Sequence, residues 1–332
     1  MVASPDYRAA QHILEQQGFN PSAWNNVVMV ASAIDRGIEV FGKPDRKSIY
    51  LRHGTTEHRW YAGNSGLNSS LARRCVSQKD VLSRLLRNAG VACPENCVFD
   101  VGDADRAWAW AKSIAPVVIK PVDGRQGKDV HMGVRDAGTL AQVFRDLAAR
   151  HRSVLVEKQV SGQDHRVFVV DGDVIAITCR RPANVQGDGV STIAELVERK
   201  NADRRIAHKK ISLDGIARGF LASQGRTLDS VPASGEDVQI RESANLATGG
   251  DAVDVTDELK GQVRELVARS VQAVPGLRCA GFDVAVERHS GEMNIIEINA
   301  SPQIQGHHFP WAGTPRDAAG AVLDVMFPET RV

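Results

Sequence analysis

The sequence of 332 residues has no apolar run near the ~18 residues of a membrane-spanning helix, and its start lacks a secretory signal pattern. Its 41 Lys and Arg nearly balance its 40 Asp and Glu, so bulk charge gives no reason to expect nucleic-acid binding. The five cysteines include no CxxC pair, which argues against a zinc site. We therefore expect a cytoplasmic protein with reduced thiols and neither a membrane nor a nucleic-acid partner.

Several nucleotide-binding and catalytic motifs are also missing. The chain has neither the GxxxxGK[ST] P-loop nor the GxGxxG dinucleotide pattern, and it has no Gly-x-Ser-x-Gly or Ser-x-x-Lys nucleophile motif. Internal repeats and low-complexity linkers are lacking too. The length suffices for two or three subdomains with a sizeable core. Chemistry based on a nucleophilic Ser or Cys is therefore not indicated.

The most informative segment that is present is 294–302, together with 281–284 upstream. Alternation along a strand places Glu297 and Asn299 on one face. A turn at 288–291 would fold this strand back beside Asp283. Two carboxylates and an amide oxygen that converge in this way suit Mg²⁺. The competing interpretation is an edge strand with solvated acids.

A second candidate site lies at 117–129, where a β-branched run ends in Lys120 and continues into a glycine-containing loop. Glycines allow successive backbone N–H groups to face a phosphate, and Lys120 would supply a positive charge. By itself this pattern is also compatible with a simple surface hairpin.

The pattern of strands and helices favours an α+β protein, because strict βαβ alternation is lacking. Asp171-Gly172 predicts a hairpin turn, and Thr256 is expected to cap a helix that carries Asp257 and Glu258 in its first turn. The region 199–237 is basic and ambiguous between helix and loop. Helices are expected over 6–17, 78–88, 103–113 and 137–150, and strands over 97–99, 117–120, 153–160, 166–170 and 174–178.

A series of motifs in order then identifies a resemblance. They are the segments 118–127, 157–166, 180–193, 225–232 and 245–250, the set Asp283, Glu297 and Asn299, and the closing stretch 319–328. From about residue 34 onward, the sequence resembles the ATP-grasp superfamily, and within it the ATP-grasp part of cyanophycin synthetase. Bifunctional glutathione synthetases and ribosomal-protein glutamate ligases are more distantly similar. The resemblance implies two α+β subdomains that clasp ATP. We expect a lead-in over 1–75, an N-terminal subdomain over 76–160 and a C-terminal subdomain over 161–332.

The resemblance also implies roles for individual residues. Lys79 and Lys120 would hold the ATP phosphates, under a loop that includes Asp123, Gly124 and Gly127. Glu157, Gln159 and Val160 would meet the adenine, and Asp164 the ribose. Arg180 and Arg241 would act with Lys120 in catalysis, and Asp283, Glu297 and Asn299 would bind the metal. His307 and His308 either bind the acceptor substrate or are solvated loop residues, and the basic run 204–210 is a solvated face or the rim of an anionic-substrate site.

The function implied is an ATP-dependent carboxylate–amine ligase that releases ADP and phosphate. Its cofactors would be ATP and Mg²⁺, with two ions expected and Mn²⁺ able to substitute. Its partners would be an amino-acid donor and an amine acceptor, and a homodimer is left open. The alternatives are an ATP-grasp kinase that stops at phosphoryl transfer and a catalytically degenerate ATP-binding module. Because the chain ends where the ATP-grasp part ends, we expect a single amide bond per reaction.

Overall fold

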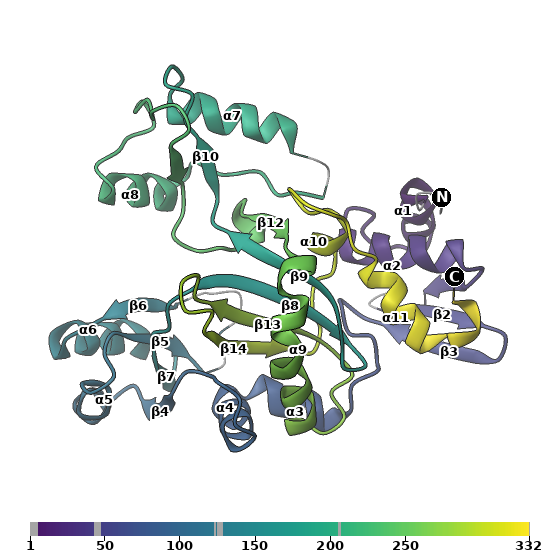
Figure 1. The fold of residues 1–332 in the computed structure, drawn as a ribbon, viewed down its shortest axis with the longest axis horizontal. Coiled ribbons are helices and arrows are strands. Elements are labelled where there is room, and N and C mark those ends of the chain that lie inside the picture. The colour runs from purple at the N-terminus through teal and green to yellow at the C-terminus, as the bar shows by residue number, and fades with distance from the viewer. Residues whose placement is uncertain (1–5, 43–47, 123, 125–128, 205–206, 332) are drawn as a thin grey trace.

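The computed structural model describes residues 6–42, 48–122, 124, 129–204 and 207–331 (Figure 1). The described strands form sheets of three, four, five and two strands. Among the described helices, none is both long and apolar enough to cross a bilayer.

The N-terminal region combines two helices with the three-stranded sheet. Asp6 accepts hydrogen bonds from the N–H groups of Arg8 and Ala9 and so begins the first helix. The second helix is apolar on most sides, and residues 27–33 are buried. This second helix packs against the five-stranded sheet and does not lie on the surface. The elements are α1 (Tyr7–Gln16), α2 (Trp24–Asp35), β1 (Glu39–Gly42), β2 (Ile49–His53) and β3 (Thr56–Trp60).

The four-stranded sheet follows, with strand order β4-β7-β5-β6. Helices α5 and α6 lie on the side of this sheet away from the five-stranded sheet (Figure 1). They cover a core that includes Ile119, Phe144 and Val156. The elements of this region are α3 (Ser70–Ser77), α4 (Lys79–Asn88), β4 (Asn96–Asp100), α5 (Ala104–Ala111), β5 (Val117–Pro121), β6 (His131–Val134), α6 (Ala137–Ala148) and β7 (Ser153–Lys158).

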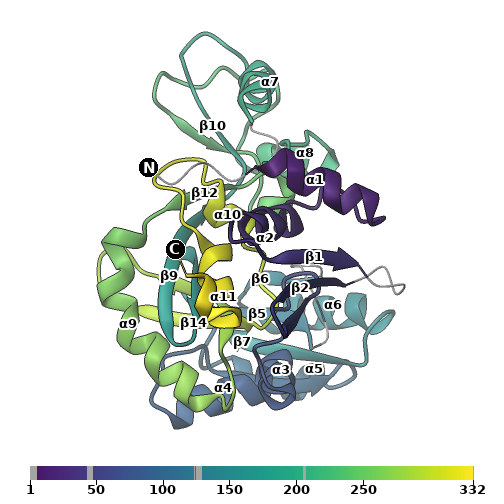
Figure 2. The same ribbon diagram turned by 90° about the vertical axis from the view of Figure 1, so that its right-hand side faces the viewer.

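The five-stranded sheet has the order β12-β9-β8-β13-β14, and each neighbouring pair is antiparallel. One face packs on α9 through Val167, Ile177 and Phe282. The opposite face packs at one end on α2 and α11 through Phe168. Figure 2 shows α9 and α11 on opposite sides of β9 and β14. The elements are β8 (Gln163–Val170), β9 (Asp173–Arg181), β12 (Asp251–Asp254), α9 (Thr256–Ala273), β13 (Cys279–Val286), β14 (Met293–Asn299), α10 (Gln305–His308), α11 (Ala318–Met326) and η2 (Pro328–Thr330).

Between β9 and β12 the chain forms a separate lobe (Figure 1). It has its own hydrophobic core, which includes Val185, Leu221 and Val238. The lobe contains β10 (Asn184–Gln186), α7 (Ile193–Asp203), α8 (Gly215–Ser223), β11 (Asp237–Gln239) and η1 (Leu246–Thr248).

The predicted helices and strands are present with shifts of a few residues at their ends, and the predicted hairpin turn is confirmed by positive φ angles of 53° at Asp171 and 89° at Gly172. The predicted cap at Thr256 is wrong, because Thr256 is the first residue of α9 and makes no capping bond. Its hydroxyl accepts the N–H of Ile177 at 2.8 Å and donates to Asp254. This N–H lies where β12 turns away from β9, and it would otherwise be buried without a partner.

Candidate functional site

One face of the five-stranded sheet, which we call the charged face, carries the predicted metal ligands together with Asp164 and Arg180. In the strand register, Asp283 on β13 lies directly opposite Glu297 on β14 and opposite Arg166 on β8. Residues opposite one another project from the same face, as does Asn299, two residues after Glu297. The predicted return of the chain between 286 and 293 is therefore confirmed, and the three proposed metal ligands share one face.

Two arginines converge on the carboxylate of Asp283. Arg166 Nε lies 2.6 Å from one oxygen, and Arg180 Nη2 lies 2.9 Å from the other. Arg180 also reaches Asp164 at 2.7 Å. Burial opposes ionisation of Asp283, yet the two guanidinium groups outweigh it and lower its pKa. For Asp164, burial is the larger effect, and its pKa is raised despite Arg180.

The donor chemistry of this face fits a divalent cation. Asp283, Glu297 and Asn299 are all half-buried and offer carboxylate and amide oxygens, which Mg²⁺ prefers. In the described part of the chain, no three His, Cys, Asp or Glu side chains stand close enough together to form a metal cluster. Each carboxylate oxygen has more than one lone pair, so the contacts of Asp283 with the arginines leave acceptor capacity for an ion.

The predicted nucleotide contacts lie on the four-stranded sheet. Lys120 Nζ and Glu157 Oε1 form a buried ion pair at 2.5 Å, with side chains 10% and 7% exposed. The resemblance assigns these two residues to opposite ends of ATP, and the structure places them side by side on β5 and β7. The ammonium group has three donors, so Lys120 retains capacity for a phosphate while bound to Glu157.

The loop after β5 is only partly described, since Asp123 and Gly127 lie outside the described residues. Lys79 Nζ donates to the carbonyl of Gly124 at 3.2 Å, which brings the first predicted lysine to this loop. The N–H of Gln159 is already used by the carbonyl of Pro116. Its side-chain oxygen accepts from Gly133. The adenine contacts of Gln159 and Val160 remain predictions.

Arg241 lies elsewhere. It is 6% exposed, and its guanidinium donates to Asp214 and to the carbonyl of Ser212. Asp214 caps α8. Within the lobe, Arg241 therefore links the start of α8 to the segment after β11. Within the described residues, its hydrogen bonds do not extend to Asp283 or Glu297, and its catalytic role stays a prediction.

Sequence reasoning missed a role for Arg166 and the burial of the histidine pair. The only signal for Arg166 was its position two residues after Asp164 on one strand. His307 and His308 are 2% and 8% exposed, so the solvated-loop interpretation is wrong. Burial lowers the pKa of His307 to about 3 and that of His308 to about 4. The centroid of the His307 ring lies 5.7 Å from that of Phe168, and among the described residues its Nδ1 has no hydrogen-bond partner.

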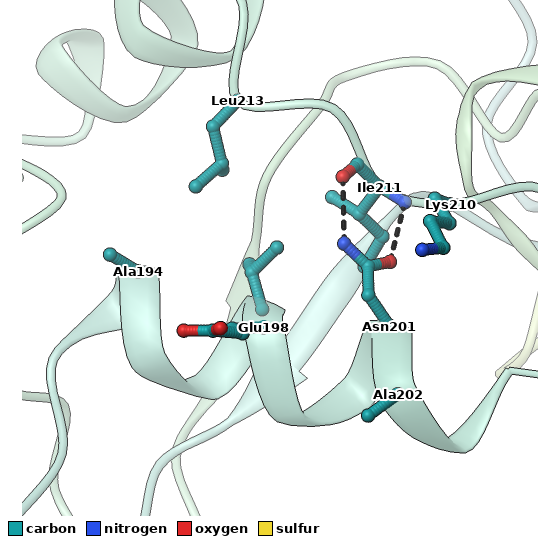
Figure 3. Close-up of a pocket in the computed structure, with 8 residues that line it drawn as sticks. Ala194, Glu198, Asn201, Ala202, Lys210, Ile211 and Leu213 are labelled. Carbon is teal, nitrogen blue, oxygen red and sulfur yellow. Dashed lines mark hydrogen bonds between the residues drawn. The ribbon is translucent and has the colours of Figure 1, made fainter.

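A hollow of about 630 Å³ lies in the lobe and not at the charged face (Figure 3). It is an open surface trough between α7 and the segment 210–213. The Asn201 side chain bonds both the N–H and the carbonyl of Ile211 and so holds these two walls together (Figure 3). Lys210 of the predicted basic run lines it, whereas none of the described nucleotide, metal or catalytic candidates does.

Comparison with known proteins gives consistent matches. Residues 77–201 match the RimK-like ATP-grasp domain. Cyanophycin synthetase of Trichormus variabilis is 36% identical over an alignment of 312 residues, which covers 90% of this chain and 34% of that protein. The glutathione biosynthesis bifunctional protein GshAB of Clostridium perfringens is 31% identical over 93% of this chain and 42% of its own length. The chain thus spans about a third of the cyanophycin synthetase and under half of the bifunctional protein.

A solved structure supports the same relationship. The bifunctional glutathione synthetase from Pasteurella multocida superposes with a TM-score of 0.70 at 30% identity. The match covers 93% of this chain and 44% of that one.

Proposed function

Because the chain belongs to the ATP-grasp superfamily, with homology to cyanophycin synthetase and bifunctional glutathione synthetase, we propose that it is an ATP-dependent carboxylate–amine ligase. In this reaction a substrate carboxylate takes the γ-phosphoryl group of ATP to give an acyl phosphate and ADP. An amine then attacks the acyl carbon and forms an amide, and phosphate leaves. The observation that carries the proposal is the convergence of Arg166 and Arg180 on Asp283, directly opposite Glu297.

The main barrier to the first step is electrostatic, because a carboxylate must approach a polyphosphate that is also anionic. Arg166 and Arg180 place two positive charges beside the carboxylates of the charged face. Such fixed charges stabilise a transition state more effectively than water, because they need no reorganisation during the reaction. Mg²⁺ held by Asp283, Glu297 and Asn299 would supply further positive charge to the phosphate oxygens.

The lysines complete the phosphate site in this proposal. Lys120 is fixed by Glu157 at the end of β5, and Lys79 lies against the loop that follows. Ala substitution at Lys120 should therefore weaken ATP binding and slow turnover together, since one charge would serve both the ground state and the transition state. Arg180 and Arg241 should affect the rate more than the affinity for ATP.

The finer assignments rest on the same residues. We place the subdomain boundaries near residues 76 and 160, of which the second lies between the four-stranded and the five-stranded sheet. Two Mg²⁺ ions per site are supported by the presence of two carboxylates and one amide oxygen on one face, with Mn²⁺ as a substitute. The substrates are an amino-acid donor and an amine acceptor in the cytoplasm.

The test is a screen of amino-acid pairs for phosphate and ADP release, with mass spectrometry of the product. ADP release that requires the amine, and an amide product, are expected. Hydroxylamine should trap the acyl phosphate when the donor alone is present. A phosphorylated product that never becomes an amide would indicate the kinase alternative. AMP and pyrophosphate as products would contradict the acyl-phosphate mechanism, and ATP binding without turnover of any pair would indicate the degenerate module.

A further inference from the structure

A small hollow of about 150 Å³ lies where the N-terminal sheet meets the open end of the β13–β14 hairpin. Its lining residues are Arg59, Tyr61, Asn64, Gly66 and Arg73. We propose that this hollow binds a free carboxylate group of the amino-acid or peptide substrate, an inference that rests on the ligase function proposed above.

Asn68 fixes the hollow to the strands of the charged face. Its side-chain nitrogen donates to the carbonyls of Cys279 and Ala300, at 2.6 and 3.1 Å. Its side-chain oxygen accepts from the N–H groups of Arg278 and Cys279. One buried amide thus binds the first residue of β13 and the residue after β14. The segment that carries the hollow is therefore anchored at the open end of the hairpin, four residues before Asp283 on β13 and three residues after Glu297 on β14.

A close backbone approach brings the hollow still nearer to the charged face. Gly63 has a φ of +89°, and a Cβ there would lie 2.6 Å from the carbonyl oxygen of Pro302. A Cβ at Gly281 would lie 2.9 Å from both the Pro302 ring and the Arg166 side chain. Only glycine fits at these two points. Pro302 therefore lies against both the turn at 61–64 and Gly281, which the Arg166 side chain also borders.

The order of residues along the sheet indicates which part of the reactants the hollow meets. On the charged face, Asp164 lies opposite Ala285, Arg166 opposite Asp283, and Phe168 opposite Gly281. Each step of two residues advances about 6.6 Å. The proposed ribose contact is at one end, the proposed phosphate and metal contacts follow, and the hollow lies beyond them. This is the side from which a substrate carboxylate would meet the γ-phosphoryl group.

The charge and size of the hollow suit a carboxylate group. Among the described residues, Arg73 donates to the carbonyl of Asn68 at 2.7 Å and to the hydroxyl of Ser70, and it forms no ion pair with an acid there. Arg59 Nε donates to the hydroxyl of Ser48 at 2.6 Å, and the Arg59 guanidinium lies 5.3 Å from the centre of the Tyr61 ring. Two guanidinium groups therefore border one space, and guanidinium matches a carboxylate in planar geometry. The volume equals roughly five water molecules, which accommodates the end of an amino acid and excludes a nucleotide.

Chemical labelling tests the site without requiring turnover. Phenylglyoxal modification of arginines, mapped by peptide mass spectrometry, should be slowed at Arg73 by a mixture of the twenty amino acids. The same mixture of amino-acid amides should not slow it. Arg74, the exposed next residue, serves as the control and should label equally throughout. Equal labelling of Arg73 in both mixtures would overturn the proposal, even if the enzyme proves to be a ligase. Selective protection would support it, even if no substrate pair turns over.

Kinetics supply the second arm once a substrate pair is known. Arg73→Gln should raise KM for one substrate by about ten- to a hundredfold, as expected for loss of a charge-assisted hydrogen bond. KM for ATP should not change, and Arg74→Gln should behave as the wild type. Replacing the bound carboxylate of that substrate by a carboxamide should raise KM of the wild type by a similar factor. The same replacement should raise KM of Arg73→Gln little further, because the two changes remove one interaction. Losses that add independently would overturn the proposal.

Discussion

Two buried carboxylates in this molecule each hold two cationic side chains, one at the charged face of the five-stranded sheet and the other where the lobe meets β12. The distances are similar in the two clusters, from 2.6 to 2.9 Å. The clusters consist of Asp283 with Arg166 and Arg180, and of Asp251 with Lys200 and Arg204.

The surroundings of the two clusters differ. The Asp251 side chain is 3% exposed and that of Arg204 is 1% exposed. The Trp311 ring covers both cations, at 5.1 Å from Lys200 and 5.3 Å from Arg204. Asp283 is more open, at 14%, and has the further acid Glu297 directly opposite. The charge pattern alone thus does not distinguish a structural cluster from a ligand site. Access for a ligand and additional acids beside the cluster make that distinction.

The largest effect expected is on activity, at the more open cluster around Asp283. Glu297→Gln should lower turnover by at least about a hundredfold, because a neutral amide weakens metal coordination with little change of shape. Stability should stay close to that of the wild type, as judged by thermal unfolding. Glu292→Gln, an exposed acid just before β14, is the matched control and should be fully active. A folded Glu297→Gln enzyme with near-normal ADP release at ordinary Mg²⁺ would remove the metal assignment.

The next effect is on stability, at the less exposed cluster around Asp251. Asp251→Asn should lower the free energy of unfolding by about 3–5 kcal/mol, because it leaves two buried cations without a carboxylate. Asp283→Asn should cost less, roughly 1–2 kcal/mol, since Arg180 retains Asp164. Urea unfolding of both variants without ligands measures the difference. Equal losses would mean that the two clusters have the same structural role.

A third effect concerns α10, which packs against both β9 and β12. Its histidines are neutral when buried, and their pKa values of about 3 and 4 lie below the usual 6.5. The unfolded chain therefore binds more protons below pH 6.5, and the stability that is present above this pH is lost as pH falls toward 4. Burial also lowers the pKa of His165, which acts in the same direction. At pH 5 we expect a loss of about 2 kcal/mol for each of His307 and His308 relative to pH 7.5.

Denaturant unfolding at the two pH values tests this expectation. His307→Gln should remove part of the dependence, even if it lowers stability at pH 7.5. If the stability of His307→Gln falls as steeply from pH 7.5 to pH 5 as that of the wild type, His307 does not contribute to the pH dependence.

The smallest effect should come from Trp311, whose ring covers the cations of the Asp251 cluster. Trp311→Leu should lower stability by about 1 kcal/mol through loss of the cation–π contacts, beyond what the smaller apolar area accounts for. Combining it with Lys200→Met separates the two contributions in a double-mutant cycle. Strict additivity would mean that the ring provides only apolar cover.

The parts of the fold and site that could be predicted depend on local signals. Alternation and one turn sufficed to place Asp283 beside Glu297, because both lie on a single hairpin. The contact of Arg166 with Asp283 spans 117 positions and depends on the register of β8 with β13, which no local pattern specifies. Asp251 likewise meets cations from a helix some fifty residues upstream.

The lobe was the least predictable region. Its strands β10 and β11 have three residues each, which is too short for an alternating pattern to be recognised. The region 199–237 between these strands was ambiguous as well, although its buried Ile211, Ala217 and Leu221 belong to one core. Thr256 illustrates a different failure. Its sequence context fits a cap, but a buried N–H on β9 takes its hydroxyl instead.

The points where the lobe leaves and rejoins the five-stranded sheet have a consequence for how this protein can change. Arg181 and Asp251 are direct partners in the register of β9 with β12, so the chain departs and returns at one rung of the ladder. A segment attached in this way is topologically a hairpin loop, whatever its length or content. An exchange of residues 182–250 would therefore leave the register of the strands that bear Arg166 and Glu297 in place, but it would have to keep Lys200 and Arg204 as partners for Asp251.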